Sequence, residues 1–549
     1  MKPFQSLIRC FSIFLLVFSC NQQQLENVQN ANRLGGTLKI SCLGSLETLD
    51  PQKIMFGTDW KVASLVYEGL IDFNSDSSGL EKHLCVSWQK LDQGKRYLFE
   101  IRDDVYFHDD PCFPDGKGRK LNAWDIYYTF QRMATRETQC PNFYLFSGRI
   151  QGIDDFNQGK TEMITGITVL DSTHIQFDLN KSYSSFLKTL TTPAAYIVAK
   201  EAVDYYGPKI NQHPVGTGPF RLNKWKQLEY LTLIKHDKYW GRDEQGVELP
   251  YLDAVQINLI SNPVIRFSEF LNGNIHLIET GEKLFSKLKD ETDFDSKYQV
   301  AGKFQDLTVR FFGIRMDNDS PLSKEPKLRQ AVAYSFNRAA INKEAYSHKE
   351  NANTFVPLIL LQDSTSRWYE YNPGYAKKLA SQIDLDVFHK PVIISSNLAT
   401  REAEFMKAGL DDLGIPNKIK IKQVRYFTGL KTDRPDIFRI SVHPNYPEPE
   451  EYYFLFYSKN TFMHAINGYK NTRYDLLFEQ SVVEQDDGKR KKIYLDLEKI
   501  LKQDVPAIYL SNFSYSYTIV PLFVNGVKGR LSSLDFRQVW LNTSHESFK

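Results

Sequence analysis

The sequence of 549 residues lacks an excess of charge of either sign. It has 68 basic and 66 acidic residues, and setting aside Lys2 and Arg9, in a segment we expect to be removed, leaves 66 of each. Nucleic-acid binding depends on basic patches, so this balance argues against DNA or RNA as the main partner. The chain is 42% hydrophobic and 24% charged, which is typical of a folded globular protein rather than a disordered one.

Long apolar runs and catalytic motifs are also missing. After Cys20 no stretch approaches the roughly 18 apolar residues of a transmembrane helix. There is no HExxH motif and no GxSxG elbow, and the SxxK string at 185–188 lacks the Lys-Thr-Gly partner of penicillin-interacting enzymes. We read His-Asp-Asp at 108–110 as a solvated turn, and Gly-Thr-Gly at 216–218 as a tight turn between domains. We therefore predict no catalytic residue, no metal and no cofactor.

The N-terminus carries a targeting signal. A basic start precedes a short apolar run, Phe11–Phe18, which is too short to span a bilayer, and Ser19 then precedes Cys20. The pattern resembles the bacterial lipoprotein signal, in which the cysteine is lipidated and becomes the new N-terminus; Phe18 departs from it, because a small residue is usual there. We predict a signal peptide over 1–19, lipidation of Cys20 and a flexible polar tether over 20–34, with an ordinary secretory signal as the alternative.

Cysteine is scarce, with six residues in the whole chain. Cys10 belongs to the signal and Cys20 to the anchor. The remaining four are Cys42, Cys85, Cys112 and Cys140, and they form no CxxC pattern. Export permits disulfides, and Cys112–Cys140 is the pair we predict, with four buried thiols as the alternative.

Strand and helix patterns alternate along the body, which indicates an α/β class. Residues 36–42 and 307–316 read as strands rich in β-branched and aromatic residues. Asn262 and Asn122 are in position to cap helices, the latter with Asp125 three residues later.

Several strings stand out along the body. The most diagnostic is VGTGPFRLNKW (Val215–Trp225), followed by HDKYWG (His236–Gly241). The others are GGTLKISCLGSLETLDPQ (Gly35–Gln52), LVYEGLIDF (Leu65–Phe73), YLFEIRDDVYFHDD (Tyr97–Asp110), FPDGKGRKLNAWDIYYTFQRM (Phe113–Met133), FFGIRMDNDSPLSKEPKLRQAVAYSFNRAAI (Phe311–Ile341) and NYPEPEEYYFLFYS (Asn445–Ser458). In this order, they resemble the large solute-binding proteins of bacterial peptide, dipeptide and nickel ABC importers. The resemblance covers nearly the whole body.

The resemblance implies an α/β, two-lobed periplasmic-binding-protein fold of type II, with an extra domain inserted in the first lobe. We place lobe I at 35–70, 213–305 and 505–549, the inserted subdomain at 71–212 and lobe II at 306–504. Lobes of this kind close on a ligand by hinge motion.

In the peptide-binding members of this family, an aspartate of the second lobe pairs with the free α-amino group of the peptide. It stands four residues before the proline of an Asp/Glu-Pro pair, which here is Glu448-Pro449, so its position holds Asn445. Losing one partner of a buried charge pair costs about 2–5 kcal/mol. Either a neighbour such as Glu448 takes over this role, or the ligand lacks a free amino end.

A loop of the first lobe, Phe56–Trp60, occupies the place of a ligand loop in the family. Its candidate ligand residues are Thr58, Asp59 and Trp60. Asp59 is a substitute partner for a cationic group or, alternatively, a helix N-cap. Trp60 and Tyr446 either wall the cleft or pack in the core.

These observations predict a monomeric lipoprotein on the periplasmic side of the bacterial cell envelope, held to the membrane only by its lipid anchor. It would capture a small-molecule ligand, a peptide or peptide-like solute, and deliver it to an ABC permease and its ATPase subunits. The alternatives are an envelope lipoprotein hydrolase and a non-peptide ligand sensor on the same fold.

Overall fold

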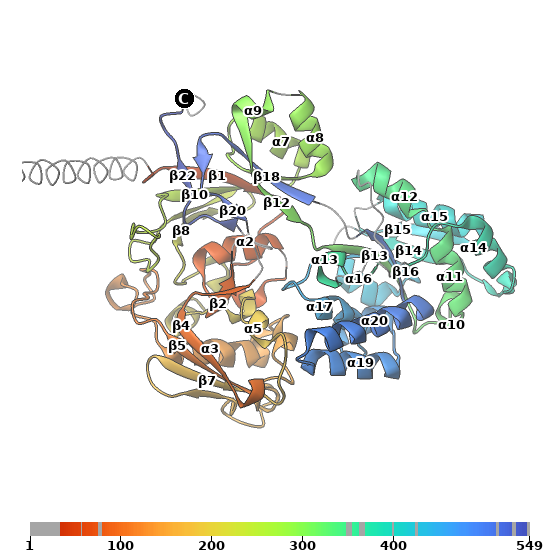
Figure 1. Ribbon diagram of the computed structural model, residues 1–549, viewed down its shortest axis with the longest axis horizontal. Helices are drawn as coiled ribbons and strands as arrows, with labels where there is room; N and C mark the ends of the chain where they lie inside the picture. Colours follow the sequence, from red (N-terminus) through yellow and green to blue (C-terminus); the bar gives the residue numbers. More distant parts are fainter. Residues whose placement is uncertain are drawn as a thin grey trace, which may run out of the picture.

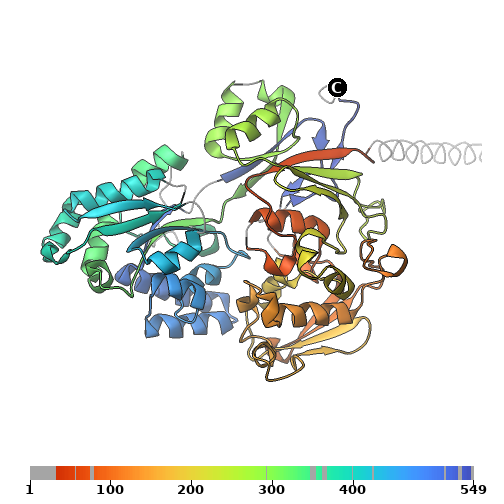
Figure 2. The same ribbon diagram turned by 180° about the vertical axis from the view of Figure 1, so that it is seen from behind.

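The chain forms two lobes that lie side by side, one of which carries an inserted subdomain (Figures 1 and 2). The computed structural model describes residues 33–55, 57–74, 79–291, 293–346, 354–361, 368–397, 400–422, 426–511, 515–529 and 534–545. The predicted signal and Cys20 lie outside these ranges.

Lobe I is built on a four-stranded sheet in the order β1-β10-β9-β8. Its strands are β1 (Thr37–Cys42), β10 (Ala254–Leu259), β9 (Tyr230–Lys235) and β8 (Phe220–Lys226). β1 pairs in parallel with β10, from Thr37 opposite Ala254 to Cys42 opposite Leu259. The whole inserted subdomain lies between these two strands in sequence, so this pairing cannot form before the insert has been made. Helix α2 (Gly57–Val66) packs its buried residues against the same core.

A second sheet of lobe I, in the order β11-β18-β12, lies beside the first. Its strands are β11 (Ile278–Gly281), β18 (Tyr515–Pro521) and β12 (Tyr298–Gln305), and the helices next to it are α7 (Pro263–Leu271), α8 (Glu282–Glu291) and α9 (Phe294–Lys297). The predicted cap of α7 is confirmed, because the side chain of Asn262 accepts from the N–H groups of Val264 (2.8 Å) and Ile265 (3.2 Å).

The inserted subdomain has its own antiparallel sheet, in the order β4-β5-β7-β6, and its own hydrophobic core. The elements are β4 (Cys85–Leu91), β5 (Arg96–Ile101), β6 (Ile167–Val169), β7 (His174–Asp178), α3 (Ala123–Ala134), α4 (Ile153–Asn157), α5 (Phe186–Thr189) and α6 (Lys200–Tyr206), with the short pair β2 (Ile71–Phe73) and β3 (Leu80–Lys82) at its start. The predicted capping arrangement of α3 is confirmed as a full capping box between Asn122 and Asp125.

Lobe II is a five-stranded mixed sheet in the order β15-β14-β16-β13-β17, with helices around it. The strands are β13 (Val309–Ile314), β14 (Val392–Ser396), β15 (Asn417–Ile421), β16 (Ile437–Val442) and β17 (Ala507–Ser511). The helices include α11 (Pro326–Ser335), α14 (Pro373–Ala380), α15 (Thr400–Asp412), α16 (Tyr426–Asp433), α17 (Pro449–Tyr453), α18 (Thr461–Asn467), α19 (Thr472–Val483) and α20 (Asp487–Asp504).

The chain passes between the lobes at two places. β12 of lobe I ends at Gln305 and β13 of lobe II begins at Val309. On the return, β17 still pairs with β13, so Ala507–Ser511 belongs to lobe II. The predicted start of the last lobe I segment at 505 is therefore too early. A helix end followed by a short strand gives no local signal of the sheet that the strand joins.

The cysteines correct a second prediction. Cys42, Cys85, Cys112 and Cys140 are free thiols, so the predicted Cys112–Cys140 disulfide is not formed. The charges nearest the Cys112 thiol are those of Asp110 and Glu201, whereas Asp50 and Arg132 act on the thiol of Cys140. The two side chains have different neighbours, which proximity in sequence does not reveal.

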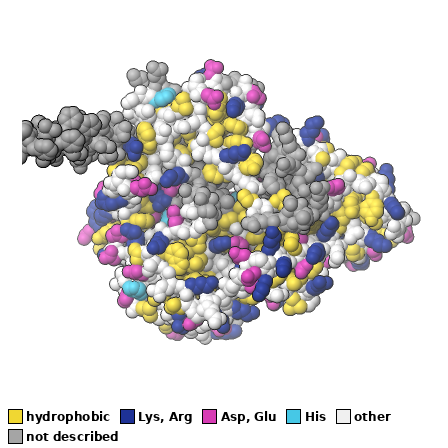
Figure 3. All heavy atoms as spheres, viewed as in Figure 1, with side chains coloured by type: hydrophobic (Ala, Val, Ile, Leu, Met, Phe, Trp, Pro, Cys, Tyr) yellow, Lys and Arg dark blue, Asp and Glu magenta, His cyan; other side chains and the backbone are white. Residues whose placement is uncertain are grey.

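No described helix could span a membrane, and neither sign of charge dominates the face in Figure 3. Among the described helices, none combines the length and the apolar character needed to cross a membrane. On the face in Figure 3, lysine and arginine side chains lie among aspartate and glutamate side chains, in keeping with the balanced composition.

Candidate functional site

Asp59, a predicted ligand residue of the first lobe, lies in the first turn of α2 and is only 1% exposed. Its Oδ1 accepts from the backbone N–H of Glu47 (3.0 Å), and burial raises the pKa of its carboxyl to about 6. Its Oδ2 has no hydrogen-bond partner in the described part of the chain. Asp59 thus holds the loop that precedes α2, and its recognition of a ligand stays a prediction.

Thr58 and Trp60 flank Asp59, and their side chains bind residues that pack around α2. The Thr58 hydroxyl donates to the carbonyl of Leu43 (3.1 Å). The indole N–H of Trp60 donates to the hydroxyl of Tyr196 (3.1 Å), and its ring packs on the lobe I core. Both residues remain partly exposed. These contacts fix the first turn of α2, and whether either side chain also touches a ligand stays a prediction.

Two side chains lie near the boundary between the lobes, Lys61 of lobe I and His443 of lobe II. Within lobe I, Lys61 of α2 forms an ion pair with Glu279 of β11. His443 follows β16 in lobe II, and its ring nitrogen lies 3.1 Å from the Thr308 hydroxyl. Part of the His443 side chain is exposed to solvent. The protein packed around its ring, together with the charge of Lys61, lowers the pKa of its imidazole.

The second-lobe candidates lie against the inserted subdomain rather than against the first turn of α2. Asn445 donates its side-chain amide to the hydroxyl of Tyr144 (2.7 Å) and to Oε2 of Glu451 (2.8 Å). Its backbone N–H reaches the same Glu451 oxygen (3.0 Å). A carboxylate six positions along the chain therefore lies beside Asn445, where the sequence offers no charge.

Tyr446 crosses the boundary between the two bodies. It belongs to lobe II, but its ring is 1% exposed and packs within the hydrophobic core of the inserted subdomain. Its hydroxyl donates to Oε1 of Glu450 (2.6 Å). Of the two predicted roles, the structure gives Tyr446 core packing rather than a position in a cleft wall.

Glu450 collects three donors on one oxygen. Arg149 (3.1 Å) and Ser185 (2.6 Å) of the inserted subdomain join Tyr446 at Oε1, and Glu450 is 2% exposed. The buried carboxylate stabilises the Arg149 cation and raises its pKa against the opposing effect of burial. We call this boundary, formed by residues 144–149 and 182–188 of the insert with 445–457 and 478–485 of lobe II, the seam.

Glu448 joins the seam through an ion pair with Lys188. Burial raises the pKa of the Glu448 carboxyl, and Lys188 acts in the opposite direction. Ser185 and Lys188, the two matching positions of the SxxK string, thus each bind a glutamate of lobe II. Two further hydrogen bonds extend the seam. The backbone N–H of Ser184 donates to the Val482 carbonyl (3.2 Å), and the side-chain amide of Gln485 donates to the Ser182 carbonyl (3.2 Å).

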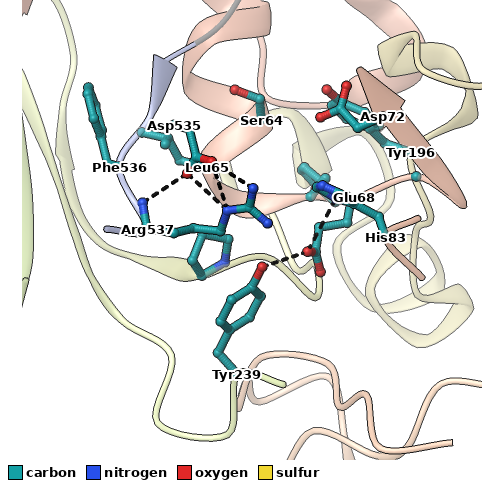
Figure 4. Close-up of a pocket in the computed structure, with 13 residues that line it drawn as sticks. Ser64, Leu65, Glu68, Asp72, His83, Tyr196, Tyr239, Asp535, Phe536 and Arg537 are labelled. Carbon is teal, nitrogen blue, oxygen red and sulfur yellow. Dashed lines mark hydrogen bonds and ion pairs between the residues drawn. The ribbon is translucent and has the colours of Figure 1, made fainter. Parts of the chain in front are cut away.

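A polar cluster inside lobe I has a structural role. Glu68, at the end of α2, accepts from Thr217 (3.0 Å), Tyr239 (2.9 Å) and Trp240 (3.1 Å), and His83 lies beside it (Figure 4). The space around it is about 30 Å³, which holds about one water molecule. It is too small for a solute, so Glu68 serves to hold the end of α2 to the segments that carry Thr217, Tyr239 and Trp240.

His108 differs from its predicted solvated turn. It is buried, with its ring nitrogens 2.9 Å from the Gly218 carbonyl oxygen and 3.3 Å from the Gly216 nitrogen. The glycines are needed because a Cβ at Gly216 would lie 2.1 Å from the Val66 carbonyl oxygen. The predicted tight turn at 216–218 thus passes directly over the end of α2.

The sequence interpretation missed the residues that hold the seam, Arg149, Glu450 and Glu451. Two adjacent glutamates inside an otherwise apolar and aromatic run, 449–456, were the available signal, because unpaired charges are rare in buried segments. Among the described residues, no group of acidic, histidine or cysteine side chains is arranged to hold a metal.

Two separately packed lobes that meet across a hinge and a polar seam define a two-lobed binding protein. The chain belongs to the bacterial extracellular solute-binding proteins of family 5, whose middle-region model matches residues 79–464. It is 23% identical over 502 residues to the dipeptide-binding protein of Escherichia coli (strain K12), covering 87% of this chain and 89% of that protein. It is 25% identical over 504 residues to heme-binding protein A of Haemophilus influenzae, covering 88% of this chain and 87% of that protein.

Solved structures show the same architecture. The periplasmic binding protein DppA of Helicobacter pylori, in complex with the peptide STSA, has a TM-score of 0.78 at 21% identity and covers 94% of this chain and 100% of its own. NikZ of Campylobacter jejuni, in complex with Ni(L-His), has a TM-score of 0.71 at 21% identity, covering 90% and 96%. The predicted two-lobed α/β fold is confirmed.

Proposed function

We propose that this protein captures a peptide or peptide-like solute between lobe I and lobe II and delivers it to an ABC permease and its ATPase subunits. The proposal is carried by the architecture: lobe I and lobe II have separate sheets and separate hydrophobic cores, and the chain passes between them at two places. Two rigid bodies joined by such crossings can enclose a solute by hinge closure. A ligand favours closure only through contacts that the open form lacks.

The ligand class rests on the relatives. The Escherichia coli relative is named for dipeptides and the Helicobacter pylori structure holds a peptide. Asn445 itself brings no charge, but the Glu451 carboxylate lies 2.8 Å from its amide. A free α-amino group therefore has a carboxylate available near the position where the family carries its aspartate.

The remaining features complete the proposal. Cys20 would be lipidated after removal of residues 1–19, so that residues 20–34 tether a monomeric body on the periplasmic side of the envelope. Because acyl chains are the anchor, the protein would lie on the membrane without spanning it. We propose no catalytic activity and no cofactor, because the buried Glu450 carboxylate is held by structural donors, Arg149 and Ser185.

The test is to identify what the cleft retains. The chain from Asn21 to Lys549 is purified natively and denatured, and the released small molecules are identified by mass spectrometry. The emptied, refolded protein is then offered a peptide mixture together with the same peptides N-acetylated. Recovery of free peptides over acetylated ones supports capture through an amino group. Recovery of a single non-peptide species would leave uptake standing and overturn the peptide assignment, and cleaved peptides would overturn the absence of catalysis.

A further inference from the structure

A cavity of about 580 Å³ lies where lobe I meets the inserted subdomain. Lobe I contributes Asp50 and Lys53 to its wall, and the insert contributes side chains of α3, among them Arg132. No described residue of lobe II lines it, and neither do residues 58–60. The cavity is therefore separate from the seam and from the predicted ligand residues of the first lobe.

A buried ion pair across this boundary holds Arg132 in place. Asp50 is 1% exposed, and the side chain of Arg132 is 10% exposed. Nη1 and Nη2 of Arg132 donate to the two carboxylate oxygens of Asp50, at 2.9 and 2.6 Å. Nη1 also donates to Oε1 of Gln52 (2.6 Å). These bonds fix the guanidinium plane and leave its other side uncommitted.

The uncommitted side is the edge formed by Nε and Nη2. A guanidinium is a planar fork of five N–H donors, so this edge can hold an oxyanion through two parallel hydrogen bonds, as the Nη1–Nη2 edge holds Asp50. Within the described ranges of the chain, no acceptor binds Nε, and Nη2 is bound only by Asp50. Since Arg132 lines the cavity, an acceptor that enters the cavity can take this edge.

The free charge and the apolar wall define the acceptor further. Because Arg132 neutralises Asp50, Lys53 is the cation of the cavity that forms no ion pair with a described residue, and Glu137 opposes it from the same wall. Beside them lie four apolar or aromatic side chains, Tyr128, Phe156, Val203 and Ile210. A fork for an oxyanion, a nearby lysine and an apolar wall suit an acid with a hydrocarbon body.

We propose that this cavity binds a small organic carboxylate, with its carboxylate on the Nε–Nη2 edge of Arg132 near Lys53 and its apolar body against Tyr128 and Phe156. A volume of about 580 Å³ is within the range of small-molecule sites. The occupant bridges lobe I and the insert, and it needs neither a free amino group nor lobe II. The site therefore goes beyond the proposed capture of peptides and does not depend on it.

The test uses 3-phenylpropionate as the probe, because it carries the carboxylate and an aromatic body but no amino group. We expect calorimetric titration to show saturable binding of 3-phenylpropionate and none of 3-phenylpropanol, its uncharged analogue. The titration is run on the emptied protein and on the same protein saturated with peptide, and we expect equal affinity in both. Absence of saturable binding, or binding that peptide abolishes, overturns the proposal.

A matched set of variants assigns the site. Arg132→Lys keeps a cation opposite Asp50 but lacks the second edge, so we expect affinity for 3-phenylpropionate to fall about tenfold or more. Lys53→Met removes an exposed charge and should weaken binding about two- to fivefold. Lys209→Met is the control, because Lys209 is also exposed but does not line the cavity. Glu137→Gln removes the opposing charge and should not weaken binding.

The lysine pair keeps the test decisive if Arg132→Lys does not fold. Equal affinities of Lys53→Met and Lys209→Met, or a loss of affinity in Glu137→Gln, would overturn the assignment. A protein that retains peptides but binds no 3-phenylpropionate would refute this site and leave the proposed uptake function intact. A protein that binds 3-phenylpropionate but no peptide would do the reverse.

Discussion

The glutamate at the centre of the seam should decide whether lobe II stays docked on the insert. Glu450→Gln keeps the size of the side chain and an oxygen acceptor for Ser185 and Tyr446, but it removes the charge that faces Arg149. Arg149 is 13% exposed in the docked arrangement. Leaving one member of a buried pair uncompensated costs about 3–5 kcal/mol.

The molecule can avoid this cost by opening. Because the insert and lobe II are joined through the hinge rather than directly, separating them returns Arg149 to water. A penalty of about 3–5 kcal/mol is a change of more than a hundredfold in a docked–open equilibrium. We expect small-angle X-ray scattering of Glu450→Gln to give a larger radius of gyration than the wild type.

The double variant Arg149→Met, Glu450→Gln is the control that tests the reasoning. It removes the stranded cation while keeping an apolar side chain in its place, so it should return most of the way to wild-type dimensions. A single variant whose scattering curve superposes on that of the wild type would refute the role of Glu450. A double variant as open as the single one would refute the electrostatic explanation.

Three further predictions concern the packing, titration and redox state of the body. Gly216→Ala places a Cβ 2.1 Å from the Val66 carbonyl oxygen, so it should lower the free energy of unfolding by about 1–3 kcal/mol or more and lower the melting temperature with it. Gly57→Ala meets open space and should leave the melting temperature unchanged. Equal melting temperatures of the two variants would contradict the close approach at Gly216. Burial raises the pKa of Glu498 from an ordinary 4.5 to about 7, so the stability present below pH 4.5 should fall by about 3 kcal/mol as the pH rises through 7. In urea titrations at several pH values, Glu498→Gln should remove this dependence of the unfolding free energy on pH. If the dependence is unchanged in the variant, it comes from other groups. In the chain from Asn21 to Lys549, thiol titration of the denatured protein without reductant should give four free thiols. A count of two would show that one disulfide is present.

The local parts of the fold were predictable from the sequence because they depend on neighbouring residues. The caps at Asn122 and Asn262 need only a side chain and the next turn of backbone. The glycines at 216 and 218 could be read as a turn, but their contact with Val66 could not, because the whole insert separates them in sequence. The same limit explains β17, whose place in lobe II depends on pairing with β13, the first strand of that lobe.

The candidate site was predicted less well, for a related reason. Around Asn445 the local sequence pointed to Glu448 as the replacement carboxylate. In the structure, Glu448 forms an ion pair with Lys188, and Glu451 lies beside Asn445. The two glutamates stand at the start of α17, and a choice between them requires the position of the insert, which supplies Lys188 and Tyr144 from far earlier in the chain.

The distribution of buried charge separates the two interfaces of lobe II. On the side toward α2, Lys61 and His443 stay at least partly in contact with water. The seam instead buries Glu450 and most of Arg149. A buried pair adds little net stability compared with apolar packing, but a misplaced partner is strongly unfavourable. The seam charges therefore determine which docked position forms more than they stabilise it. Tyr446, which is inserted in the core of the subdomain, supplies the apolar contact between the two bodies. A lobe that can return to only one position recreates the same cleft each time it closes.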